Sequence, residues 1–99
     1  MSPQPPFRLV LSNYFRSQAA ALPEEIHRQL KTRLVYLMSN PRHPSLHTHE
    51  VKGAIGQFGG KIFEAYVTDK YRMTWEYGPS KGEIILRNID NHDACLRHP

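Results

Sequence analysis

The sequence has very little cysteine and no long hydrophobic run, and these two absences exclude several classes of protein. Cys95 is the one cysteine among 99 residues, so an internal disulfide cannot form and a disulfide-stabilised scaffold is excluded. A lone thiol indicates a reducing compartment, and we expect the cytoplasm. The longest apolar run spans 34–38, far short of the ~20 residues that a membrane helix needs, so we expect no membrane partner.

Two further absences concern the first residues and the glycines. Segment 1–6 is polar and proline-rich and lacks the basic stretch and apolar run of a signal peptide, so we expect a disordered lead-in. The six glycines do not form a phosphate-binding loop, which argues against a nucleotide-binding domain. The length fits a single domain, which we expect over 7–99.

The charge balance and the histidines bear on chemistry. The chain has 13 Lys+Arg against 9 Asp+Glu, a formal net charge of +4. This favours a polyanionic partner such as nucleic acid, although a charge of this size is also ordinary for a soluble domain. Six histidines are present, and imidazole is the side chain best suited to proton transfer near neutral pH.

Hydrophobic periodicity predicts a small α+β domain with the order β-α-α-β-β-β. Apolar residues recur at helical spacing between Pro23 and Pro41, and they alternate with polar residues over 71–77, as in a strand. We predict a long loop over 41–60, with a short extended piece near 50–52, and a polar tail over 90–99 with at most one helical turn. The expected elements are a strand over 7–11, helices over 13–21 and 23–40, and strands over 62–68, 71–77 and 83–89.

Polar side chains that could do chemistry gather in four segments, which strand pairing could bring to one edge of the sheet. Such a set suits RNA cleavage without a metal. A base takes the proton of a ribose 2′-hydroxyl, an acid protonates the departing 5′-oxygen, and cations stabilise the charge on phosphorus. The four segments contain His47, His49, Glu50 and Lys52, then Lys61 and Glu64, then Arg72, and finally His92 and Asp93.

The histidines of the predicted loop also fit an alternative, a metal site. His43, His47 and His49 follow the pattern H-x3-H-x-H, and imidazole is a common metal ligand. This spacing is unlike the usual structural zinc patterns, and no cysteine completes it. We therefore favour chemistry without a metal or another cofactor.

Three stretches carry a resemblance to a known family. The first, over 34–46, reads L-x-x-L-M-x-N-P-x-H-P-x-L, and the second is H-E-V-K-G over 49–53. The third, over 63–73, reads F-E-A-x-V-x-x-x-Y-R-M and is followed by Ile84-Ile85-Leu86 and by His92-Asp93. In this order and spacing, the chain from about Phe7 to His98 resembles the RelE/ParE superfamily of bacterial toxin–antitoxin toxins, and within it the RelE-like and YafQ-like ribonucleases.

The resemblance implies a RelE-like fold, in which two helices pack on one face of a small, twisted, mostly antiparallel sheet. It implies an mRNA endonuclease that acts without a metal, on the ribosome at the 30S A site, and that inhibits translation. A cognate antitoxin would cover the active surface in a toxin–antitoxin hetero-oligomer.

The same resemblance implies roles for individual residues. His49 matches the general base, His92 the general acid, and Arg72 an arginine that stabilises the transition state. Lys52 matches a basic position that contacts phosphate. Further candidates for substrate binding, with roles left open, are Lys61, Glu50, Arg87 and His98, where Glu50 is also an alternative base and His98 lies near the place of a functional aromatic residue.

Two other functions remain open within the superfamily. The ParE branch shares the fold but binds and inhibits DNA gyrase without cleaving RNA. His49 and His92 argue against this branch, because binding alone does not require two imidazoles at proton-transfer positions. The chain could also be a degenerate member that retains only antitoxin binding.

Overall fold

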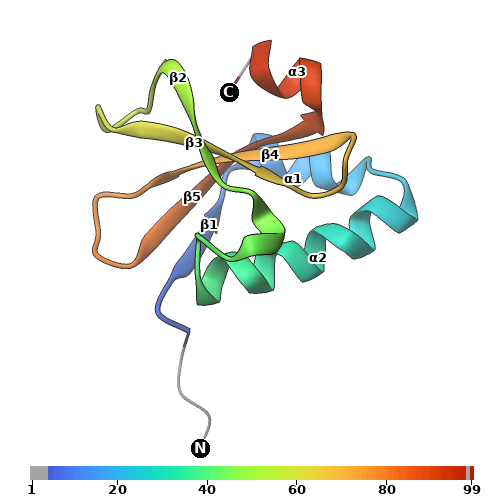
Figure 1. Cartoon of the computed structure of the whole chain (residues 1–99), viewed down its shortest axis with the longest axis horizontal. Helices are drawn as coiled ribbons and strands as arrows, with labels where there is room; N and C mark the ends of the chain where they lie inside the picture. The colour runs from blue at the N-terminus through green and yellow to red at the C-terminus, as the bar shows by residue number, and fades with distance from the viewer. Residues whose placement is uncertain (1–4, 98) are drawn as a thin grey trace, which may run out of the picture.

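The computed structural model describes residues 5–97 and 99, and in it α1 and α2 cover one face of a mixed five-stranded sheet (Figure 1). The strand order is β1-β5-β4-β3-β2, in which β1 runs parallel to β5 and the other pairs are antiparallel. This arrangement confirms the predicted α+β class. The elements are β1 Arg8–Leu11, α1 Asn13–Ala20, α2 Glu24–Ser39, the 3-10 turn η1 Pro44–Leu46, β2 His49–Ile55, β3 Lys61–Tyr66, β4 Tyr71–Tyr77, β5 Glu83–Asn91 and α3 His92–Arg97.

The two helices begin close to the predicted places, at residues suited to helix N-termini. Ser12 caps α1, because its Oγ accepts a hydrogen bond from the backbone N–H of Phe15 at 3.0 Å. Helix α2 begins at Glu24 rather than at Pro23, since Pro23 occupies the N-cap position. Glu24 and Glu25 fill the first turn, where carboxylates interact favourably with the positive end of the helix dipole.

The apolar stripe of α2 faces the sheet, as its spacing predicts. Leu30 and Leu37 are buried in the core, and Ile26 and Leu34 pack against it at the margins. Val35, within the apolar run over 34–38, is 54% exposed. It lies off the stripe and faces away from the sheet.

The sheet supplies the other half of the core through alternate residues. Met73 and Trp75 of β4 are fully buried, and the Trp75 ring stacks on Phe63 of β3 with centroids 4.7 Å apart. Tyr77 was expected on the same buried face, but it is 45% exposed because it lies at the end of β4. The alternation therefore predicts the core-facing residues of β4 correctly except at the end of the strand.

The prediction of a long loop over 41–60 is wrong in its second half. Residues His49–Ile55 form β2, which pairs antiparallel with β3 at the edge of the sheet. The register shifts between Glu50 and Ile55, and Gly53 lies there with φ +81°. Because an irregular edge strand exposes both of its faces, β2 shows no hydrophobic alternation that could reveal it.

The C-terminal segment returns over the sheet. Strand β5 runs two residues further than predicted, to Asn91, and α3 follows at once. Helix α3 packs against β4 and β5, and in Figure 1 it lies on the other side of the sheet from α2.

Of the predicted lead-in, only Pro5 and Pro6 are among the described residues, and both precede β1 outside any helix or strand. No helix in the described part of the chain is long and apolar enough to cross a membrane.

Candidate functional site

The face of the sheet away from α1 and α2 carries buried charged side chains. Along β3, Phe63 and Ala65 point into the core, so Glu64 between them points to the opposite face. Glu64 is 0% exposed, and Arg72 of β4 is 7% exposed. Because burial of a charge is costly unless the charge is paired, these groups must compensate one another.

One carboxylate oxygen brings three basic side chains together. Glu64 Oε1 lies 3.1 Å from His49 Nε2, 3.5 Å from His92 Nδ1 and 3.8 Å from Arg72 Nε. His49 comes from β2, Arg72 from β4 and His92 from the start of α3. The three residues predicted to be catalytic therefore meet at one place, around a glutamate that the predicted set of site residues does not include.

Strand register explains why these residues meet. His49 lies directly opposite Glu64 in the β2–β3 pair, and Arg72 lies opposite Tyr66, two residues along β3. His92 follows the last residue of β5, and its backbone N–H donates to the Lys70 carbonyl at 2.8 Å. The residues that make these contacts lie far apart in the sequence, so no local sequence pattern predicts the contacts.

Arg72 is held rigidly beneath the site. Its Nη1 donates hydrogen bonds to the backbone carbonyls of Thr68, at 2.8 Å, and of Asp69. The guanidinium carbon lies 3.6 Å from the centroid of the Tyr66 ring, a cation–π contact. The site therefore contains a permanent positive charge with a fixed orientation.

The two histidines differ in what their ring nitrogens face. His49 Nδ1 lies 2.9 Å from the His47 carbonyl, and its Nε2 faces Glu64, so both nitrogens face groups that can only accept hydrogen bonds. A ring nitrogen that carries a proton can donate to such an acceptor. His92 directs Nδ1 at Glu64, and its Nε2 makes no hydrogen bond with the described residues.

Buried polar atoms without a hydrogen bond of standard geometry concentrate at this cluster. Within residues 5–97 and 99 there are five such side-chain atoms, and the one outside the cluster is Trp75 Nε1. Native proteins pair nearly all buried polar atoms, so each exception calls for an explanation, catalysis among them. The other four atoms are Glu64 Oε1, Glu64 Oε2, Arg72 Nε and His92 Nδ1.

No protein-family model and no curated protein matches the sequence, but several solved structures share its fold. A chain of the archaeal RelE–RelB complex from Pyrococcus horikoshii superposes with a TM-score of 0.68 at 14% identity, over 86% of this chain and 93% of that one. The chain has the RelE-like fold. A chain of the toxin–antitoxin complex RelBE2 from Mycobacterium tuberculosis gives 0.63 at 15% identity, over 88% and 99%. The free-state Escherichia coli toxin RelE, as a mutant, gives 0.55 at 14%, over 89% and 85%.

Three other predicted site residues lie on β2 and β3 of the RelE-like sheet. Lys52 is exposed on β2. Lys61 Nζ lies 3.9 Å from Glu50 Oε1, an exposed pair that contributes little to stability. These three residues leave charged groups at the surface of β2 and β3, the strands that also carry His49 and Glu64. His98 falls outside the described residues.

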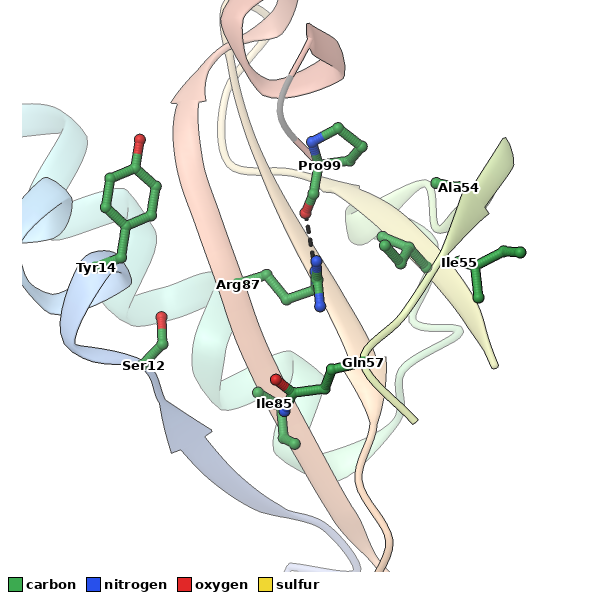
Figure 2. A pocket seen from close by; sticks show the side chains of 9 residues that line it. Ser12, Tyr14, Ala54, Ile55, Gln57, Ile85, Arg87 and Pro99 are labelled. Atoms are coloured by element: carbon green, nitrogen blue, oxygen red, sulfur yellow. Dashed lines mark hydrogen bonds between the residues drawn. The ribbon is translucent and has the colours of Figure 1, made fainter. Parts of the chain in front are cut away.

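Arg87 belongs to a second polar cluster. It forms an ion pair with the buried Glu76, and its Nε donates to the Pro99 main-chain oxygen at 3.0 Å. The Thr74 hydroxyl donates to the same oxygen at 2.8 Å. Figure 2 shows that the main-chain oxygen of Pro99 points toward Arg87. This contact lies on the face of the sheet away from α1 and α2, which we call the open face. A groove of about 590 Å³ lies beside this contact, lined by Ser12, Tyr14, Ala54, Ile55, Gln57, Ile62, Ile85, Arg87 and Pro99.

A second hollow opens at His92. It has a volume of about 560 Å³ and is lined by two acids, a lysine, an amide and the histidine. His92 is therefore reachable from solvent, although the Nδ1 side of its ring is buried. The lining residues are Asp69, Lys70, Asn91, His92 and Asp93.

The three histidines of segment 41–49 point to different neighbours. His43 stacks on Tyr36 with centroids 4.1 Å apart, and His47 packs against Tyr66 at 4.6 Å. His49 alone faces Glu64. The side chains of the described residues include no group of three or more that is arranged as a metal site.

Cys95 lies beneath the cluster on α3. Its thiol is buried and faces the Arg72 carbonyl, with Sγ at 3.5 Å. Burial, and then the negative charges of Glu64 and Asp90, raise the pKa of the Cys95 thiol to about 12. The thiol therefore stays protonated at neutral pH and is a poor nucleophile.

Proposed function

We propose that the chain is the toxin of a toxin–antitoxin pair and that it cleaves mRNA on the ribosome without a metal. The observation that carries this proposal is the gathering of two imidazoles and a fixed arginine around one buried carboxylate, on the open face of a RelE-like sheet. Proton transfer to and from RNA oxygens needs such groups, whereas a surface that only binds a protein does not.

In the proposed reaction, His49 takes the proton of the ribose 2′-hydroxyl as the 2′-oxygen attacks the adjacent phosphorus. His92 donates a proton to the 5′-oxygen as its bond to phosphorus breaks. Arg72 stabilises the additional negative charge from below. For His49 to act as the base, its Nδ1 must leave the His47 carbonyl, since both ring nitrogens face acceptors in the free protein. We propose that bound RNA causes this release.

The surrounding charges support RNA as the substrate. Lys52 and Lys61 are exposed on β2 and β3, the strands that carry His49 and Glu64, and we propose that they contact phosphates, with Glu50 as a partner of Lys61. We assign Arg87 to a neighbouring phosphate, although Glu76 and Pro99 hold it in the free protein. His98 stays a predicted contact.

The proposed protein partner is an antitoxin. Two of the solved structures that share the fold are complexes, one of RelE with RelB and one named as the toxin–antitoxin complex RelBE2. We infer that a cognate antitoxin binds this chain in a hetero-oligomer and blocks its open face.

The test is primer extension on a reporter mRNA in a translating extract. Wild type, His92→Ala and His27→Ala are compared, where His27 lies on α2, away from the site. We expect codon-spaced cuts from the wild type and His27→Ala, and none from His92→Ala. If no protein cuts and translation continues, the nuclease proposal is wrong, and inhibition of DNA supercoiling by purified gyrase would then favour the ParE-like function.

A further inference from the structure

The role of Glu64 can be derived from the way His92 meets it. His92 Nδ1 is buried and faces Glu64 Oε1 at 3.5 Å, whereas its Nε2 has no partner among the described residues. Both Glu64 oxygens also lack a hydrogen bond of standard geometry there. A buried donor and a buried acceptor that lie side by side satisfy one another when Nδ1 carries a proton.

We propose that Glu64 is a positioning residue, which holds His92 with Nδ1 protonated and leaves Nε2 as the atom that exchanges a proton with the substrate. An unconstrained neutral histidine favours the opposite tautomer, with the proton on Nε2. Glu64 is well placed to reverse that preference, since it is fully buried and accepts without being able to donate.

The catalytic role of the contact between Glu64 and His92 rests on the proposed nuclease function. As an imidazolium, His92 gives its Nε2 proton to the departing 5′-oxygen while the bond from that oxygen to phosphorus breaks. The neutral ring that remains keeps its proton on Nδ1, which is the tautomer that Glu64 stabilises. The carboxylate therefore favours the correct form of His92 both before and after transfer, without touching the RNA.

A purely structural explanation is that Glu64 only neutralises the buried Arg72, at 3.8 Å. The two explanations differ in one observable, the position of the proton on the His92 ring. The same sheet offers a matched comparison in Glu76, a second buried glutamate, which pairs with Arg87 instead of a histidine. Loss of either carboxylate removes one partner of an arginine, but only loss of Glu64 should change His92.

Long-range proton–nitrogen NMR of the histidine rings reads that proton directly. Spectra are recorded at about pH 8.5, where an ordinary imidazole is neutral, for the wild type, Glu64→Met and Glu76→Met. We expect a proton on His92 Nδ1 in the wild type and in Glu76→Met, and its transfer to Nε2 in Glu64→Met. A wild-type His92 without a proton on Nδ1 overturns the proposal, and so does a Glu64→Met protein with an unchanged ring. Should Glu64→Met not fold, the wild-type spectrum decides alone.

Kinetics of RNA cleavage separate this proposal from the nuclease proposal. We expect Glu64→Met to lower kcat by about 10²-fold or more, within the 10²–10⁴-fold that a positioned acid or base contributes, with KM changed less than about 3-fold. Glu64→Gln keeps one carbonyl acceptor for Nδ1 and should recover part of the lost kcat. If the wild type cleaves RNA and Glu64→Met has unchanged kcat, the positioning role is wrong. If the ring behaves as expected but the wild type cleaves nothing, the nuclease proposal fails instead.

Discussion

Removal of one member of the buried pair of Arg72 and Glu64 should destabilise the fold measurably, and a double-mutant cycle can isolate the interaction between the two charges. Unit charges about 4 Å apart attract by about 4 kcal/mol at an effective dielectric constant of about 20, and Arg72 Nε lies 3.8 Å from Glu64 Oε1. Removal of one partner of a buried pair typically costs about 3–5 kcal/mol, because it leaves the other charge unpaired. We therefore expect Arg72→Met to lower the free energy of unfolding by about 3 kcal/mol, at the low end because His49 and His92 also contact Glu64.

The assay is urea unfolding followed by circular dichroism. A control variant, Arg28→Met, removes an exposed arginine of α2 that pairs with Glu24 and Glu25, and it should change stability by less than about 0.5 kcal/mol. The double variant Arg72→Met/Glu64→Met should be less destabilised than the sum of the two single variants, by about 1–3 kcal/mol. Additive effects, or a loss below about 1 kcal/mol for Arg72→Met, would refute the argument that these charges compensate one another in a dry environment.

Two further predictions concern the thiol and the surface lysines. Because burial raises the pKa of Cys95 to about 12, the thiolate should be scarce at pH 8, and a disulfide reagent should label Cys95 at least 100-fold more slowly in the folded protein than in urea; equal rates would contradict the burial. Lys52→Ala and Lys61→Ala should each weaken binding to single-stranded RNA and lower the slope of log affinity against log salt by about 0.7, in filter-binding titrations over several salt concentrations. An unchanged slope would remove that lysine from the proposed phosphate contacts.

The sequence predicts the elements whose periodicity comes from one buried face. Helix α2 and strand β4 each place apolar residues against the core at regular spacing, and both lie close to where their patterns place them. Strand β2 has no such face. Its register with β3 shifts, Gly53 adopts a positive φ, and its side chains are mostly exposed. The residues of β2 therefore show no pattern that predicts its pairing with β3.

The residue types of the site can be identified from the sequence, but the contacts between them are made only in the folded chain. His49, Arg72 and His92 are conspicuous because imidazole and guanidinium groups suit phosphate chemistry. Glu64 carries the contact that joins them, and the sequence places it in one of the four polar segments but gives it no role among the predicted site residues. One signal could have indicated its role: its neighbours Phe63 and Ala65 place Glu64 on the face opposite to the core, which is also the face of Arg72.

The energetics of the open face bear on which function the chain has. Strand β4 turns Met73 and Trp75 toward the core and Arg72, Thr74 and Glu76 toward the other face, where all three are buried. The buried charges of Glu64 and Arg72 lose their contacts with water on folding, and this cost of desolvation can exceed the attraction between them. A module that only bound a protein would be more stable with apolar residues in these places. The presence of this costly arrangement together with two imidazoles supports the nuclease proposal over a degenerate binder.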